Sequence, residues 1–204
     1  MRISGKDFLL FLCSVFLMLL VGCAQNISVQ FPSYTPTGNG SQLALIPPQN
    51  IHLEAVQDTR PPGRAEGTRE AAFGVPMGTV EFRPPASDIV RDVIMSEFKN
   101  AGHRFTDKEQ QVTIWAKILT FEVGTNTTPL YWDIMGNTKI EVEVMNPSGQ
   151  QFKNTYTSTC QDRTYVWPGG KLVKKVMQSC ITEFANTMRN DTELAKAMKN
   201  IAKK

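Results

Sequence analysis

The sequence predicts an α+β fold: a two-layer sandwich whose mostly antiparallel sheet has helices packed on one face. One observation is the alternation of apolar and polar residues, typical of half-buried strands, over residues 49–57, 111–123, 137–145 and 151–160. The other is apolar residues at helical spacing in two segments, one before the second of these strands and one after the last. No internal repeat and no second domain is indicated.

The first predicted strand covers residues 49–57. The sequence Asp58-Thr59-Arg60-Pro61 follows and ends it, because a proline cannot donate to a sheet ladder. We expect a short hairpin next, in which residues 70–75 and 78–82 pair across a turn that contains proline and glycine.

A helix follows this hairpin. Ser87 is its expected N-cap, because a serine hydroxyl can accept a hydrogen bond from an amide of the first turn. Gly102 ends it, since glycine readily takes the left-handed conformation of a helix C-terminus. The apolar residues at helical spacing between these two positions are Ile89, Val90, Val93, Ile94 and Phe98.

Three strands come next. In residues 111–123, one face is expected to carry Val112, Ile114, Ala116 and Ile118, and the opposite face Trp115, Leu119, Phe121 and Val123. Residues 137–145 and 151–160 are predicted to pair as an antiparallel hairpin, because Asn146-Pro147-Ser148-Gly149 has the composition of a turn.

Two helices close the chain. Residues 172–188 carry apolar side chains at helical spacing. The sequence Asn190-Asp191-Thr192 then indicates a break and a new N-cap, before a short helix with Leu194, Met198 and Ile201 on one side.

The N-terminus has the pattern of a secretory signal. Arg2 and Lys6 precede an apolar run of about 14 residues, which is shorter than the roughly 20 that a membrane span needs. Leu20-Val21-Gly22-Cys23 closes the run and resembles the lipobox of bacterial lipoproteins. The resemblance implies cleavage before Cys23, a diacylglycerol thioether on its sulfur and acylation of the new amino terminus. An ordinary secreted protein with an incidental Cys23 thiol is the alternative.

The residue after the cysteine indicates the membrane. In the sorting rule of such lipoproteins an aspartate there favours the inner membrane, so Ala24 indicates the outer membrane, with the protein facing the periplasm. We expect a signal peptide over 1–22, a lipidated flexible tether over 23–48 and a single periplasmic domain over 49–204. Such a tether spans roughly 25–30 Å, which would let the domain sit off the bilayer.

Two cysteines remain in the expected domain. A disulfide between Cys160 and Cys180 would close a loop of about 20 residues and stabilise the fold by roughly 3 kcal/mol; two buried free thiols are the alternative. No metal and no cofactor besides the lipid on Cys23 is expected, because His52 and His103 are the only histidines. The formal net charge of +3 gives no reason to expect a nucleic-acid partner.

No combination of nucleophile, base and orienting group is recognisable in the sequence. We expect His103 to be a solvated loop residue and His52 to have a structural role in its strand. Glu141 and Glu143 lie about 7 Å apart on one strand face, a separation that could suit paired carboxylates, but solvent-facing strands look the same. The sequence therefore predicts that the protein is not an enzyme.

Candidate binding residues lie in the predicted turns and loops. Arg60 is in the proline-containing turn, and the aromatic candidates are Tyr131, Trp132, Tyr165 and Trp167. Loop aromatics often anchor protein contacts. The alternative is that they cover edges of the core.

The order of short motifs resembles the YajG-like family of bacterial lipoproteins. The motifs are the lipobox, Asp58-Thr59-Arg60-Pro61, Ala101-Gly102 with Phe105, Val112-Thr113-Ile114, a strand around Tyr156, and Asp191-Thr192-Glu193-Leu194. The resemblance implies a lipoprotein without an established enzymatic activity. We expect a lipid-anchored envelope protein that binds a protein or cell-wall partner; the alternatives are an accessory subunit of an envelope transport or secretion complex and, less favoured, a periplasmic enzyme.

Overall fold

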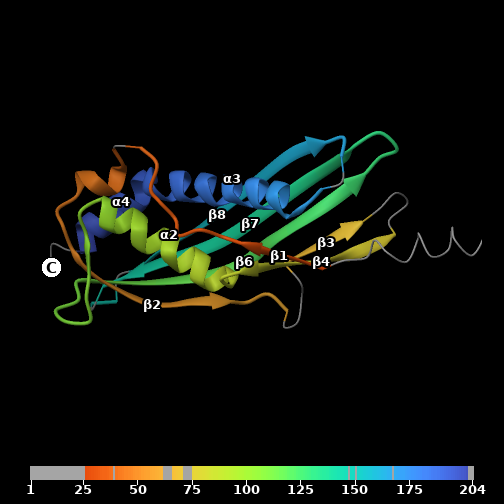
Figure 1. Ribbon diagram of the computed structural model, residues 1–204. Coiled ribbons are helices and arrows are strands. Elements are labelled where there is room, and N and C mark those ends of the chain that lie inside the picture. The colour runs from red at the N-terminus through yellow and green to blue at the C-terminus, as the bar shows by residue number, and fades with distance from the viewer. Residues whose placement is uncertain are drawn as a thin grey trace, which may run out of the picture.

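The computed structural model describes residues 26–38, 40–61, 66–70, 75–146, 148–149, 151–166 and 168–201. None of the helices in these ranges is both long enough and apolar enough to cross a bilayer. The elements, shown in Figure 1, are β1 (Ile27–Gln30), the 3-10 helix η1 (Gln42–Leu45), β2 (Asn50–Asp58), β3 (Gly67–Glu70), β4 (Pro76–Arg83), α2 (Ala86–Asn100), β5 (Arg104–Phe105), β6 (Val112–Thr127), β7 (Trp132–Met145), β8 (Gln151–Thr164), α3 (Gly170–Arg189) and α4 (Thr192–Ile201).

All eight strands belong to one sheet, with β6 at its centre. One edge of β6 pairs antiparallel with β7 along nearly its whole length, and β7 pairs antiparallel with β8. The other edge is shared: β2 pairs in parallel with residues 112–118, and β3 pairs in parallel with residues 123–124. The sheet therefore forks at residues 119–122, with β5 beside β2 on one branch and β4 and β1 beside β3 on the other.

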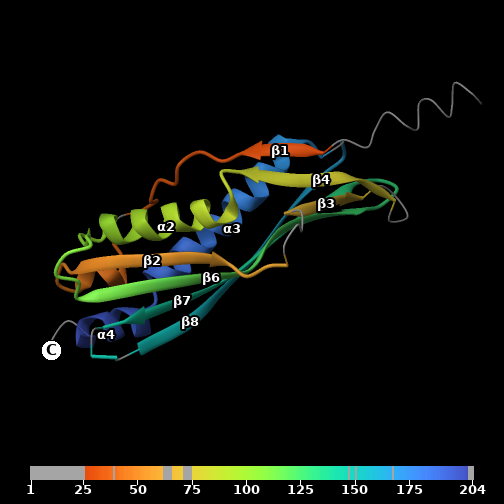
Figure 2. The ribbon, with the colours of Figure 1, turned by 90° about the horizontal axis from the view of Figure 1, so that it is seen from below.

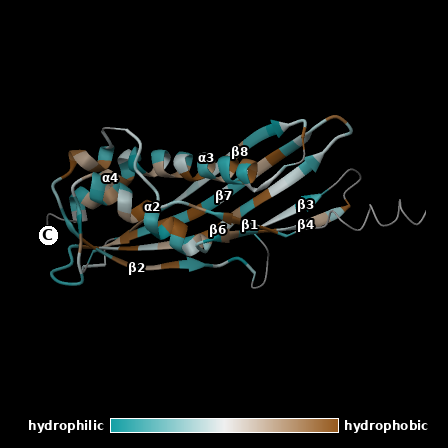
Figure 3. Cartoon of the chain, viewed as in Figure 1, coloured by the Kyte–Doolittle hydropathy of each residue, from teal (hydrophilic) through white to brown (hydrophobic). Residues whose placement is uncertain are grey.

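The helices pack on one face of the sheet (Figure 2). Phe98 of α2, Phe184 of α3 and Phe121 of β6 are among the largest fully buried side chains, and alternate hydrophobic and hydrophilic positions run along the strands in Figure 3. This confirms the predicted α+β sandwich. The 16 residues of β6 make the molecule elongated, since that many residues of strand extend about 50 Å.

A bulge in β6 contradicts the predicted faces of this strand. The pairing with β7 shifts register between Ile118 and Thr120, so Leu119 is an extra residue. An extra residue reverses the alternation of faces downstream. Phe121 and Val123 are therefore buried with Ile118 and not on the opposite face.

The helix ends agree with the sequence except at one cap. Gly102 has the expected positive φ of 94° after α2, and Asp191 accepts hydrogen bonds from the amides of Glu193 and Leu194 at the start of α4. Ser87 is not the N-cap of α2: the helix starts at Ala86, and the N-cap is Pro85, whose backbone is extended with φ −57° and ψ 157° and whose side chain makes no capping hydrogen bond.

The segment expected to be a tether differs most from its prediction. β1 pairs in parallel with β4, Phe31 packs edge-on against Phe82 with ring centroids 5.1 Å apart, and Leu43 of η1 is fully buried. A flexible tether as far as residue 48 is therefore wrong. Burial of these apolar side chains offsets the entropy lost in ordering the segment, and the folded domain therefore includes β1 and η1.

Between β1 and η1 this segment crosses α2 and α3. The Tyr34 amide donates to Asp92 over 2.6 Å, and its hydroxyl donates to the buried Glu97 carboxylate over 2.5 Å. Arg189 of α3 lies 4.0 Å from the other oxygen of Glu97 and donates to the Thr37 carbonyl. Burial and then the Glu97 carboxylate raise the pKa of Tyr34, so its hydroxyl remains a donor at neutral pH.

Candidate interaction surface

One end of the elongated sheet carries most of the exposed apolar side chains. We call this end the tip. It consists of Val75, the β6–β7 turn (Thr128–Tyr131), the end of β8 with Tyr165 and Val166, and the first turn of α3. β1 begins a short way behind it: Asn26 accepts a hydrogen bond from the amide of Thr79, four residues along β4 from Val75, which is about 13 Å of strand. Figures 1 and 2 both show these elements at one end.

The β6–β7 turn is held by one threonine. The Thr128 hydroxyl accepts from the amides of Leu130 and Tyr131 and donates to the Tyr131 carbonyl. A second backbone bond runs from the Thr128 amide to the same carbonyl over 2.9 Å. The turn therefore fixes Leu130 in an outward position, where 77% of its surface is exposed.

Tyr131 and Tyr165 are in contact in the structure, which the sequence did not predict. Their rings meet edge-to-face with centroids 6.4 Å apart. The Arg163 guanidinium lies 3.8 Å above the Tyr131 ring and donates to Asp133 over 2.7 Å. Tyr165 is 74% exposed and Val166 71%. These side chains form an outward-facing cluster with an ordered arrangement.

The two tryptophan candidates differ from this cluster. Trp132 is the first residue of β7, paired with Thr127 and Thr164, and its half-buried ring packs against the core. It is therefore a strand residue at the core edge and not an exposed loop anchor. Trp167 lies outside the described residues, as does Cys23.

Basic side chains flank the cluster at the start of α3. Lys171, Lys174 and the apolar Val166 line a shallow pocket of about 560 Å³. Lys175 is paired with Asp162 over 2.7 Å. The N-terminus of α3 adds the partial positive charge of a helix dipole, so this side of the tip favours anionic groups.

Arg60, the remaining binding candidate, lies at the fork of the sheet. Its side chain is 11% exposed, and its guanidinium donates twice to Asp58 and also donates to the Phe121 carbonyl over 2.5 Å. That carbonyl lies where β6 has left β2 and has not yet reached β3. The hydrogen bond from Arg60 holds the pKa of Asp58 below its ordinary value. Arg60 therefore closes the gap in the sheet, which leaves little of it for a ligand.

Cys160 and Cys180 are neighbours on β8 and α3, and both are free thiols. The Cys180 thiol donates to the Gly136 carbonyl over 3.3 Å. A side chain at position 136 would lie 2.9 Å from Met177 and 3.2 Å from the Cys180 sulfur, so glycine there lets α3 pack closely on β7. Burial raises the pKa of both thiols, which also contact each other. The disulfide remains a prediction.

The histidines are engaged in different ways. His103 is buried, and the prediction of a solvated loop histidine is wrong: its Nδ1 accepts from the Gln49 amide and its Nε2 lies 3.2 Å from the Leu43 carbonyl. Burial lowers the pKa of His103. His52 lies between the carboxylates of Glu54 and Asp107, at 3.0 and 2.9 Å. Across the described ranges, no group of three or more His, Cys, Asp and Glu side chains could hold a metal.

The carboxylate pair considered in the sequence lies on the open face of β7. Glu141 is bound by Lys153 over 2.8 Å and lies 3.5 Å from Lys117. The hydrogen bond from Lys153 lowers the pKa of Glu141. Glu143 accepts from Gln151 of β8. Both carboxylates therefore belong to cross-strand pairs on a polar surface.

Solved structures resemble this chain at low sequence identity. Protein XCC0632 from Xanthomonas campestris has the same fold, with a TM-score of 0.60 at 9% identity over 86% of this chain and 99% of its own. A minor lipoprotein from Acinetobacter baumannii gives a TM-score of 0.43 at 10% identity over 69% and 89% of the two chains. No curated protein matches the sequence significantly.

The family comparison covers most of the domain. A family described as "Uncharacterized lipoprotein" matches residues 51–199. This range runs from the start of β2 to the last turn of α4. It includes every motif after the lipobox on which the sequence resemblance was based. The chain therefore belongs to this lipoprotein family, the YajG-like family.

Proposed function

We propose that the protein is lipidated at Cys23, held on the outer membrane facing the periplasm, and acts without catalysis by binding a protein or cell-wall partner. The observation that carries the proposal is the position of β1. Only two residues separate Cys23 from Asn26, which is bound to Thr79 of β4, four residues from Val75 of the tip. Three peptide units reach at most about 11 Å, so the tip would stay next to the bilayer.

The opposite end would then project into the periplasm. We call it the distal end: η1, the loop over 106–111 and α4 (Figure 1). The strands between the two ends extend about 50 Å. The length of the domain, and not a flexible tether, would therefore give the reach toward a partner. Leu45 of η1 is a large apolar side chain at this end, and it is 75% exposed and therefore accessible to a partner.

The engaged histidines support a non-catalytic role. His103 uses both ring nitrogens in buried contacts with backbone groups, and His52 lies between two carboxylates on the sheet surface. Neither arrangement places a nucleophile beside a histidine base, which acyl-transfer catalysis would need.

One observation favours the second candidate, an accessory subunit of a transport or secretion complex. β8 is a 14-residue strand that pairs on one side only within the described chain. An open strand edge can accept a strand from another chain. A partner that adds to β8 would make the domain part of a larger assembly.

Site-specific photocrosslinking in intact cells tests the proposal. A crosslinking residue at Leu45 or Lys108 of the distal end is expected to capture a protein or cell-wall fragment, whereas the same residue at Lys139 in the middle of the open sheet face is the control. Capture of a transport subunit at Thr157 of β8 would favour the second candidate. A Cys23→Ser variant that is processed normally and remains on the membrane would overturn the lipid anchor.

A further inference from the structure

We infer that the tip docks on the lipid bilayer that carries the anchor, with its exposed apolar and aromatic side chains in the headgroup region and its lysines beside lipid phosphates. The inference rests on the proposed function in one respect, the lipid on Cys23. It assigns an occupant to a surface for which the sequence suggested a protein partner.

The distribution of exposed apolar side chains points to this end. Within the described residues, seven large apolar side chains are exposed, and four of them lie at the tip: Val75, Leu130, Tyr165 and Val166. Single exposed apolar residues are ordinary on a protein surface. A group of them on neighbouring loops indicates a surface that meets an apolar phase or a partner.

These side chains are held outward and do not fold back on the core. The hydroxyl of Thr128 fixes the turn that carries Leu130. The hydroxyl of Thr164 likewise accepts from the Val166 amide and donates to its carbonyl. A surface already ordered in this way loses little conformational entropy on binding.

The length of chain before β1 decides the occupant. The anchor residue can lie no further than about 11 Å from Asn26, and Asn26 is bound to Thr79, about 13 Å of strand from Val75 of the tip. An acylated Cys23 lies at the glycerol level of the leaflet, so the end of the domain that carries the tip stays close to the lipid surface. A protein partner of the tip would have to fit into the narrow space between the tip and the lipid.

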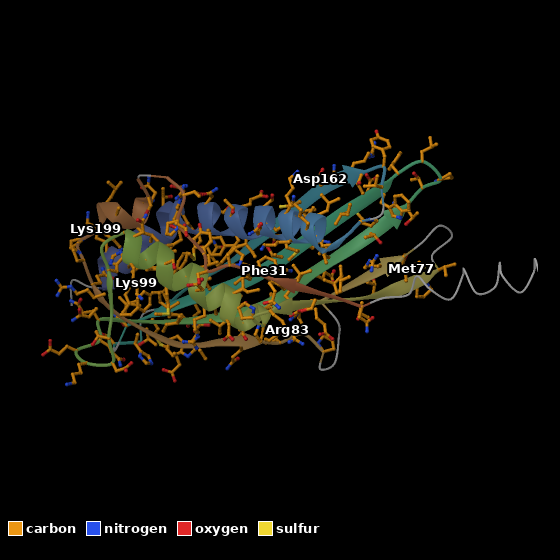
Figure 4. The ribbon with its side chains drawn as sticks, viewed as in Figure 1. Phe31, Met77, Arg83, Lys99, Asp162 and Lys199 are labelled. Atoms are coloured by element: carbon orange, nitrogen blue, oxygen red, sulfur yellow. The ribbon has the colours of Figure 1, made fainter. Side chains whose placement is uncertain are left out.

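The charges and aromatic groups suit a phospholipid surface. Lys171 and Lys174 lie beside Val166 in the tip pocket, and Arg163 and Lys175 are also basic, although paired with Asp133 and Asp162. Figure 4 shows Asp162 and Met77 at this end and Lys99 and Lys199 at the other. Tyrosine rings are enriched at membrane interfaces, and lysines near the surface are attracted to anionic lipids.

Depth-dependent quenching tests the inference on the full lipidated protein. Leu130→Cys and Leu45→Cys are a matched pair, because the two leucines are 77% and 75% exposed at opposite ends. Each variant would carry an environment-sensitive fluorophore and be reconstituted in vesicles of phosphatidylethanolamine and phosphatidylglycerol. Lipids with a spin label near the headgroup are expected to quench the Leu130 probe several-fold more than the Leu45 probe.

The lysines are tested in the same vesicles. Lys171→Glu with Lys174→Glu is expected to reduce quenching of the Leu130 probe, and to reduce it less when the vesicles contain only zwitterionic lipid. Lys139→Glu with Lys108→Glu, away from the tip, is the charge-matched control. An equal loss of quenching in both double variants would contradict a specific role of the tip lysines.

Vesicle flotation separates failure of the inference from failure of the anchor. Protein that does not float lacks a working anchor, and both proposals then fail. Protein that floats while its Leu130 and Leu45 probes are quenched equally, or not at all, overturns tip docking alone. A photocrosslinker at Leu130 that captures a protein in cells, without lipid adducts, would assign the tip to a protein partner and also overturn the inference.

Discussion

The tip and the distal end are built on the same long strands but handle apolar residues in opposite ways. At the distal end, η1 and α4 lie over the sheet, and Leu43 and His103 are buried between the elements that meet there. At the tip, the strands end in short turns, and Leu130 and Tyr165 face outward. Both ends contain apolar side chains, so the difference lies in what covers them. At the distal end the chain itself covers Leu43 and His103, although Leu45 stays exposed, whereas at the tip the described chain leaves Leu130 and Tyr165 uncovered.

Truncation of one leucine at each end should give the largest contrast. Leu43→Ala is expected to lower the free energy of unfolding by about 2–5 kcal/mol, because it leaves a cavity in the core. Leu130→Ala should change it by less than about 0.5 kcal/mol, as for other exposed positions. Urea denaturation of both variants measures the two values. Similar losses would mean that the tip is part of the folding core, and the proposed difference between the ends would then be wrong.

Regular segments of the fold were predictable because local patterns determine them. The alternation in β7 and β8, the stop at Gly102 and the cap at Asp191 depend on neighbouring residues, and the structure contains all three. The face of Phe121 was not predictable by alternation, because one bulged residue at Leu119 reverses the pattern without any local signal.

Long-range contacts explain the remaining errors. Nothing next to His103 in sequence indicates that Leu43 and Gln49 would surround it, more than 50 residues away. Residues 24–48 are polar in composition, so their local pattern did not predict β1, a strand that forms by pairing with β4. For the candidate site, the sequence identified Tyr131 and Tyr165 but not Leu130 or Val166, because exposure depends on where β6 and β8 end in space.

The arginines of two ion pairs, one in the interior and one at the tip, should also differ in what they contribute to the free energy of unfolding. Arg60→Ala is expected to lower the free energy of unfolding by about 1–3 kcal/mol, since it removes the guanidinium that donates to the Phe121 carbonyl and to Asp58. Arg163→Ala at the tip should lower it less, because solvent screens an ion pair whose arginine side chain is half exposed. Thermal and urea unfolding of both variants check the order. A larger loss for Arg163 would contradict the role assigned to the fork.

The smallest expected effect is a pH dependence that belongs to the distal end. Burial lowers the pKa of His103 in the folded protein below the ordinary histidine value of 6.5. As the pH falls below that value, the unfolded chain binds a proton that the folded chain resists. The stability that the neutral His103 contributes is therefore complete above pH 6.5 and decreases as the pH falls toward the folded pKa. The decrease from one such group cannot exceed about 1.4 kcal/mol per pH unit.

Two histidine variants test whether this pH dependence of stability arises from His103. The free energy of unfolding, measured by urea at pH 7.5 and 5.5, should decrease with acidification in the wild type and in His52→Gln, which removes the histidine on the sheet surface. In His103→Gln the decrease should be smaller, because the buried titrating group is gone. Carboxylates with lowered pKa values, such as Asp58 and Asp191, release their contribution only at more acidic pH. A decrease that disappears in His52→Gln and persists in His103→Gln would place the pH dependence on the sheet surface and away from the buried contacts of the distal end.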